Sequence, residues 1–279
     1  MFDWLQDVFG AIGHPGLWRL YRRVFLRSLV DEGWRYVVFA LALWLLLHVL
    51  LRKRLAHRLI GDWPRRADLQ REIVYSIGTV AVFAALAAVV LALVVSGRVE
   101  IYEDPGKHGL AWFFLSGPLL LVWHDAYSYW THRLLHMRWL MRHVHAVHHR
   151  SRHPSPFAAY AVHPVESLVI GLALLLPLLV LPLNGYVVVG FGILEAIRAV
   201  YSHAGVETMP RGVSRHWFWG RLATSTHHHL HHEAVRGNYA LWFTWWDRWC
   251  GTERPDYLER FDAATAPRPR PVEGAGAPA

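Results

Sequence analysis

The histidines of this sequence are concentrated in short segments whose spacing suits metal binding. Twenty of the 279 residues are histidine, and the densest segments are 132–136, 145–149 and 228–232. The first has the spacing H-x-x-x-H, and the other two contain H-x-x-H-H. Residues three or four positions apart lie on one face of a helix, so each segment would aim its imidazoles in one direction.

The number of imidazoles predicts two metal ions rather than one. The H-x-x-x-H and H-x-x-H-H patterns supply eight, and His203, after the last apolar run, would be a ninth. Without a metal, neutral imidazoles need hydrogen-bond partners and protonated ones repel one another. One metal ion takes about four to six ligands. The candidate ligands are His132, His136, His145, His148, His149, His203, His228, His231 and His232.

Three carboxylates are candidates for fixing the orientation of these imidazoles. Asp125 lies seven residues before His132, two helical turns earlier on the same face, where it could accept a hydrogen bond from a ligand imidazole. Glu166 and Asp247 are candidates for the same role. The alternative for each is a carboxylate at a membrane boundary.

The elements that must position these residues are apolar. Hydrophobic residues make up 54% of the chain and charged residues 18%, and uncharged runs cover 36–51, 73–97, 108–124 and 167–194. Because a transmembrane helix needs about 20 apolar residues, the second run is long enough to span. The third spans if its helix continues into 126–130. The first is either a tilted span or a helix that enters the membrane only partway.

The last run predicts a hairpin of two short helices. It contains Pro177, Pro182 and the turn sequence Asn184-Gly185. We therefore expect helices at roughly 165–182 and 186–202, which would bring all histidine segments to one side of the membrane. A single kinked span would separate them.

The distribution of Lys and Arg predicts the orientation. The segments 52–71 and 133–153 are rich in these residues, 98–107 has two, and the turn at 183–185 has none. By the positive-inside rule, 52–71, 133–153 and the C-terminal part face the cytoplasm. The basic residues of 19–35 conflict with a full span at 36–51. We expect no secretory signal peptide, and a bacterial cytoplasmic membrane as the location.

These patterns predict an all-α integral membrane protein. It would have four or five transmembrane or re-entrant helices, with a cytoplasmic histidine-rich helical cap. Residues 1–262 would form one membrane-embedded catalytic domain, and the Pro/Ala/Gly-rich residues 263–279 a disordered tail. The single Cys250 excludes a disulfide scaffold, a thiolate zinc site and a cysteine-ligated iron–sulfur cluster. We expect no nucleic-acid partner.

Two other functions use membranes and histidines. A metal transporter predicts polar or acidic residues within the membrane, and the four apolar runs have no acidic residue. A haem-binding electron carrier predicts histidines deep in facing spans, and only His48 comes close.

The order and spacing of the motifs over about 120–255 resemble the fatty acid hydroxylase/sterol desaturase superfamily. The resemblance implies a membrane non-haem di-iron oxygenase that hydroxylates or desaturates a lipid of sterol or fatty-acyl type. It would use O2 and electrons from a separate ferredoxin- or cytochrome-type donor. Two Fe would be the cofactor, and zinc could replace them in a purified sample. The motifs are 125–136, 145–149, His163-Pro-Val-Glu166, 228–233, Gly237-Asn238-Tyr239 and 243–252.

The resemblance also implies how the ligands divide between the metals. One metal would take His136, His145, His148, His228 and His231, and the other His132, His149, His203 and His232. In one branch of the superfamily a further histidine lies four residues before the position of His203, where this chain has Ala199. The second metal is then one imidazole short, which argues against that branch. Water, an asparagine, or one of His124, His163 and His216 could complete the site.

Overall fold

The computed structural model describes residues 15–268 of the chain. The opening segment, to which the expectation about a signal peptide applies, and residues 269–279 of the expected tail lie outside the described residues. Within them, nearly all regular structure is helical, and the only sheet pairs Ile101–Tyr102 (β1) in parallel with Leu183–Asn184 (β2). The predicted all-α class is confirmed.

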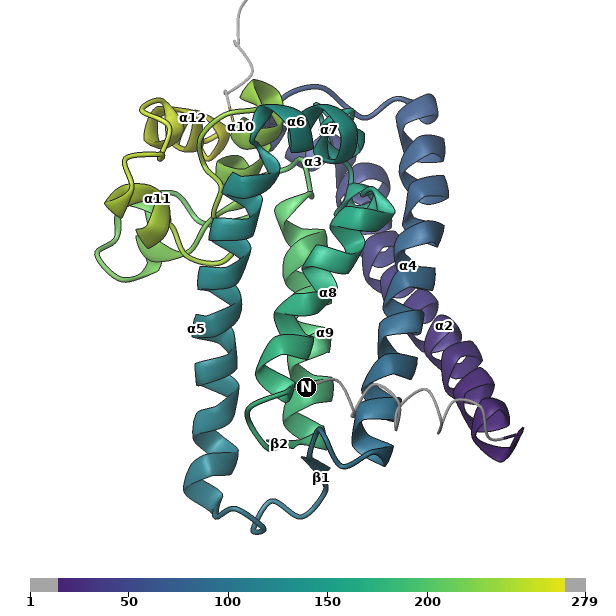
Figure 1. The fold of residues 1–279 in the computed structure, drawn as a ribbon. Coiled ribbons are helices and arrows are strands. Elements are labelled where there is room, and N and C mark those ends of the chain that lie inside the picture. The colour runs from purple at the N-terminus through teal and green to yellow at the C-terminus, as the bar shows by residue number, and fades with distance from the viewer. Residues whose placement is uncertain (1–14, 269–279) are drawn as a thin grey trace, which may run out of the picture.

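Five long helices form the body of the protein (Figure 1). Three of the described helices are long and apolar enough to cross a membrane: 18–50, 66–95 and 185–202. The first run therefore lies on a helical segment long enough for a span, because its helix includes the preceding flank. The five are Pro15–Trp44 (α2), extended by a π-helical turn at Leu45–Leu50 (η1), Arg66–Val95 (α4), Leu110–Leu135 (α5), Pro164–Leu178 (α8) and Gly185–Ser202 (α9).

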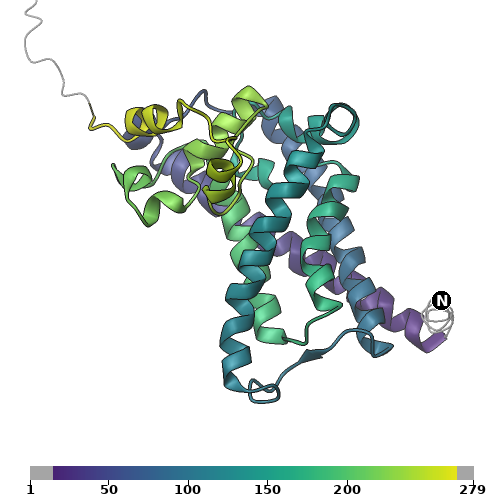
Figure 2. The ribbon, with the colours of Figure 1, turned by 60° about the vertical axis from the view of Figure 1, so that its left-hand side comes forward.

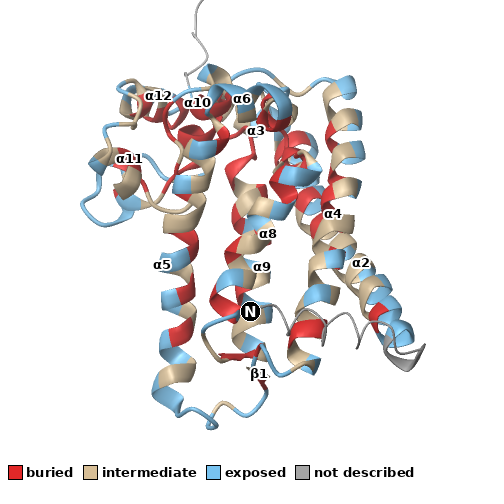
Figure 3. Cartoon of the chain, in the orientation of Figure 1, coloured by how far each residue is buried: buried red, intermediate tan, exposed pale blue. Residues whose placement is uncertain are grey.

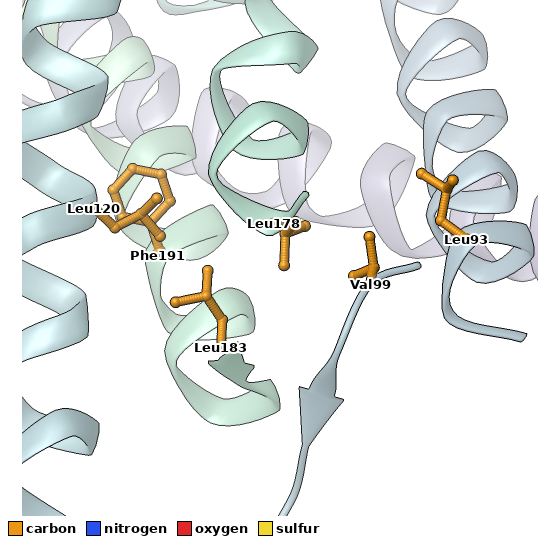
Figure 4. Packing of buried hydrophobic residues seen from close by; sticks show 6 residues of the cluster. All are labelled: Leu93, Val99, Leu120, Leu178, Leu183 and Phe191. Atoms are coloured by element: carbon orange, nitrogen blue, oxygen red, sulfur yellow. The ribbon is translucent and has the colours of Figure 1, made fainter. Parts of the chain in front are cut away.

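The predicted hairpin is confirmed: α8 and α9 run in opposite directions and are joined near β2 (Figure 1). Asn184 fixes the turn, since its Oδ1 accepts a hydrogen bond from the amide of Tyr186 at 2.9 Å and its Nδ2 donates to the carbonyl of Glu103 at 3.1 Å. The first helix ends at Leu178, earlier than expected. Apolar side chains of the cluster shown in Figure 4 pack α8 and α9 against α4 and α5.

The short helices gather at the opposite end from the turn, where they form a cap over the long helices (Figures 1 and 2). Buried residues are dense in this cap (Figure 3). All three histidine segments lie there, as the hairpin predicted. The helices of the cap are Arg52–Leu55 (α3), Ala56–Arg58 (η2), Arg138–Leu140 (α6), Met141–His145 (η3), Ala146–His149 (α7), Pro156–Tyr160 (η4), Val213–Arg215 (η5), Trp219–Arg221 (η6), Ser225–Ala234 (α10), Trp245–Trp249 (α11) and Tyr257–Ala264 (α12).

The C-terminal part of the chain packs into this cap over more residues than its composition predicts. Tyr257 and Phe261 of α12 are fully buried against Leu230 of α10. Helix α12 continues to Ala264, so the first two residues of the expected tail, 263 and 264, are helical. The apolar contacts of α12 stabilise this helix, although the residues that follow it are rich in Pro and Ala.

The hairpin predicts a simple pattern of accessibility. In a Cys250→Ser background, Gly106→Cys and Val180→Cys lie at the turn end, whereas Arg54→Cys and Arg211→Cys lie at the cap end. A membrane-impermeant thiol reagent added to sealed vesicles should label one pair and leave the other unlabelled until the vesicles are opened. Labelling of one member from each pair on the same side would contradict the hairpin.

Candidate metal centre

The nine predicted ligands converge on two neighbouring points within the cap. In each group, every residue offers one ring nitrogen, and these nitrogens all lie within 4.8 Å of one another. No predicted ligand lies outside the two groups. The five-histidine group is His132, His136, His145, His149 and His231, and the four-histidine group is His148, His203, His228 and His232.

The division between the groups differs from the one that the resemblance implies. His148 and His228 belong with His203, whereas His132 and His149 belong with His136. Helix geometry gives the reason. Residues i and i+4 are offset by about 40° around a helix, whereas i+3 lies about 60° to the other side of i. Each i, i+4 pair therefore faces one group, and the i+3 histidine between them faces the other.

The outer ring nitrogens of five ligands are held by acceptors around the centre. The Nδ1–H of His132 donates to the carbonyl of Tyr239 at 2.7 Å, and that of His231 to the carbonyl of Gly237 at 2.7 Å. In the same way, His145 donates to Glu166 Oε1 at 2.8 Å, His148 to the Ala161 carbonyl at 3.4 Å, and His203 to the Ala199 carbonyl at 2.7 Å. These bonds fix the tautomer and leave Nε2 with a free lone pair.

The inner nitrogens consequently face one another without a proton between them. Nε2 of His132 lies 3.1 Å from Nε2 of His145, and Nε2 of His148 lies 3.3 Å from Nε2 of His203. Two lone pairs at such distances repel unless a cation lies between them. Nitrogens bound about 2.1 Å from one ion at right angles are about 3.0 Å apart. The donor set therefore fits two metal ions.

Burial keeps these imidazoles in the form that binds metal. Desolvation in the cap lowers the pKa of His148 to about 3 and that of His203 to about 4. The pKa values of His228, His231 and His232 are also lowered well below the usual value by burial. All five are neutral at pH 7, and neutral imidazole is the ligating state.

The three candidate carboxylates have different roles. Glu166 contacts a ligand, since it accepts the hydrogen bond from His145. The expectation for Asp125 is wrong: its carboxylate accepts from the amide of Phe243 at 3.1 Å and from Trp245 Nε1 at 2.6 Å. Although Asp125 shares a helix with His132, its side chain attaches Phe243 and Trp245, at the start of α11, to α5.

Asp247 acts on a ligand through the backbone. Its carboxylate accepts from the amides of Tyr239 and Ala240 at 2.9 and 2.8 Å. The carbonyl of Tyr239 in turn receives the Nδ1–H of His132. Asp247 thus positions the acceptor of a ligand rather than the ligand itself.

A cavity of about 440 Å³ connects the two groups with the space between the long helices. Its cap end is formed by histidines of both groups, among them His132, His145 and His203. Its other walls are mostly apolar side chains of α4, α8 and α9, such as Phe83, Leu174 and Phe191. The cavity can therefore bring a lipid chain or ring system to both groups at once.

Comparison with known proteins shows which family this region resembles. The profile of the family described as "Fatty acid hydroxylase" matches residues 117–252, the region that contains all nine histidines. Residues 117–252 therefore resemble the fatty acid hydroxylase family, and the similar proteins include sterol oxidases and desaturases. No solved structure matches it.

Several curated proteins are similar to this chain over 51–65% of its length. Lathosterol oxidase of Rattus norvegicus is 31% identical over 65% of this chain and 60% of its own length. A Delta(7)-sterol 5(6)-desaturase of Gibberella zeae is 29% identical over 57% of this chain and 48% of its own. Methylsterol monooxygenase 1 of Rattus norvegicus is 29% identical over 51% and 48%. The chain spans about half to three fifths of the length of these relatives.

The superfamily position occupied by Ala199 has no substitute among the histidines considered for it. His163 Nδ1 accepts from the amide of Val165 at the start of α8, and His216 Nδ1 accepts from the amides of Phe218 and Trp219. His124 lies beside Glu195. Within the described residues, the second group therefore holds four imidazoles, and the Ala199 backbone only supports His203.

Sequence reasoning missed the backbone acceptors, because a carbonyl is present at every residue. The acceptor for His231 depends on a sharp turn after α10, in which Val235, Gly237 and Asn238 have φ values of 57°, 76° and 51°. A Cβ on Gly237 would lie 2.8 Å from the carbonyl oxygen of Thr252, so the turn requires glycine there. The adjacent Gly237-Asn238 was a usable signal of this turn.

The two groups predict separate losses of metal. In His203→Ala, one of four ligands of the smaller group is removed, and bound metal should fall from about two ions per chain to about one. His143→Ala is the matched control, since His143 lies in the same cap but is exposed and outside both groups. Elemental analysis of the purified proteins measures this. Two ions retained by His203→Ala would contradict the assignment.

Glu166 gives a second prediction. Glu166→Ala removes the acceptor of His145, and loss of such a partner typically weakens metal affinity about 10–100-fold. Glu233→Ala is the control, because Glu233 directly follows a ligand but its carboxylate binds Arg260 at 3.0 Å. Competition with a chelator measures the affinities. Equal effects of the two substitutions would show that the hydrogen bond to His145 has no specific role.

Proposed function

We propose that this protein is a membrane-bound di-iron oxygenase that hydroxylates or desaturates a lipid, using O2 and electrons from a separate donor. The observation that carries the proposal is the apolar cavity that ends on histidines of both groups. The names of the relatives support a sterol as the substrate class, with fatty-acyl lipids as the alternative.

Iron is the proposed occupant of both groups. Imidazole ligands suit Fe, Zn, Cu and Ni, so zinc could bind in place of iron in a purified sample. When bound, a pair of Fe ions supplies the O2 activation that removal of hydrogen from an unactivated C–H bond requires. The five residues of the larger group and the four of the smaller group would hold them.

The protein's own side chains supply position and the exclusion of water. Apolar residues of α4, α8 and α9 hold the lipid. The cap covers the centre with buried helices, so that His231 and His232 are fully shielded from solvent. Acceptors such as Glu166 keep the imidazole rings in a fixed orientation throughout the reaction.

The proposed location is a bacterial cytoplasmic membrane with the centre on the cytoplasmic side. The helices long enough to span and the sterol-modifying enzymes among the relatives support an integral membrane protein. The concentration of Lys and Arg in 52–71 and 133–153, both at the cap end, supports the cytoplasmic side. From that side a ferredoxin- or cytochrome-type donor would deliver electrons to the cap.

Purification from an iron-supplemented host tests this function. We expect about two Fe per chain, no Soret band, and lipid oxidation that depends on O2 and a reductant. His148→Ala should abolish the oxidation, because His148 lies in the four-histidine group and also lines the cavity. His143→Ala should retain it.

The alternatives give different results in the same sample. A Soret band would indicate the haem-binding electron carrier. Metal transport into vesicles by protein that oxidises no lipid would indicate the transporter. Comparing the lipids of a host with and without the gene identifies the substrate.

A further inference from the structure

One part of the cavity wall is polar although it lies away from the histidine groups. His124 of α5 and Glu195 of α9 face each other across it, with His124 Nδ1 3.2 Å from Glu195 Oε1. Ser128 Oγ, one turn further along α5, lies 3.3 Å from His124 Nδ1. All three residues line the cavity.

Away from the histidine groups, other polar side chains of the cavity are satisfied by the protein. Glu166 Oε2 lacks a partner, but it belongs to the carboxylate that holds the ligand His145. Glu32 and Arg35 of α2 pair with each other, and Arg35 also donates to the carbonyl of Asp31. Thr79 donates to the carbonyl of Tyr160 at 2.7 Å, and Thr131 to that of Tyr127 at 2.7 Å. These side chains have a structural explanation.

Glu195 is different because half of its carboxylate is unused. Oε1 accepts from Trp242 Nε1 at 2.7 Å and lies beside His124. Among the described residues, no donor reaches Oε2. This oxygen is not fully buried. A carboxylate is costly to place among apolar helices. Its free oxygen, with an imidazole and a hydroxyl beside it, is a ready acceptor next to potential donors.

We propose that His124, Ser128 and Glu195 bind a hydroxyl group of the lipid substrate. A hydroxyl both donates and accepts, so it can donate to Glu195 and accept from His124 or Ser128 in one place. A hydrocarbon would leave Glu195 Oε2 unpaired, and a ketone could not donate to the carboxylate. This inference rests on the proposed function and names the substrate class as a hydroxylated lipid.

The helices also set the distance between this subsite and the metal groups. His124 precedes His132 by eight residues on α5, and Glu195 precedes His203 by eight residues on or just after α9. Eight residues correspond to about 12 Å along a helix. On both helices, the residue of the subsite therefore lies the same distance along the axis from a ligand histidine. The hydroxyl group and the carbon presented to the metal groups are then separated by several bonds of one substrate molecule.

Binding of a matched lipid pair tests the subsite without using the reaction. The probes are cholestanol and cholestane, which differ in one hydroxyl group, added to the full-length metal-loaded protein in detergent. We expect the wild type to bind cholestanol about tenfold or more tightly than cholestane. In His124→Phe and in Glu195→Gln this ratio should fall toward one, chiefly through weaker binding of cholestanol.

Thr79→Val is the matched control, because it removes a polar group from the same cavity whose hydrogen bonds are made within the protein. It should preserve the preference. Glu195→Gln retains an acceptor for Trp242, so it tests the subsite even if His124→Phe fails to fold; thermal unfolding and metal content verify the fold. An unchanged ratio in a folded, metal-loaded Glu195→Gln protein, or no preference in the wild type, would overturn the inference.

The binding test and the test of the proposed function can fail separately. A preference for the hydroxylated probe in a protein that oxidises no lipid would support the subsite and contradict the oxygenase. Lipid oxidation by a protein with no preference for the hydroxylated probe would support the oxygenase and contradict the subsite.

Discussion

The structure depends on one electrostatic constraint: nine neutral imidazoles direct ring nitrogens at two points. Where carbonyls and Glu166 hold the outer N–H groups, the inner nitrogens carry lone pairs that repel at 3.1–3.3 Å. The long helices, the cap and the turn after α10 together impose this arrangement. Cations relieve the repulsion, so metal binding would contribute to the stability of the whole cap as well as to chemistry.

The hairpin of α8 and α9 lets a membrane protein meet this constraint. It returns the chain to the cap end, so His203 at the end of α9 can join ligands that precede α8 and ligands that follow α9. It also leaves an apolar space beneath the centre, because two short helices pack between longer neighbours. The same element thus places a ligand and forms a wall of the cavity.

The sequence contained most of this arrangement but not its details. H-x-x-H-H spacing predicted which histidines converge, and Asn184-Gly185 predicted the hairpin, because both depend on local geometry. The division of the ligands depends on how helices from distant parts of the chain face each other. The same is true of Asp125, whose sequence spacing indicated His132 as its partner although Trp245, 120 residues away, is its actual one. Carbonyl acceptors leave no mark in residue types.

The contacts between α5 and the C-terminal part of the cap have a consequence for synthesis in the cell. Tyr129 of α5 bonds to Thr252 at 2.9 Å, and Thr252 also donates to Asp247, which supports the acceptor of His132. The first ligand segment thus acquires its final support only after the chain has been made as far as residue 252. The first ligand segment, with any metal it holds, is then complete only late in biogenesis.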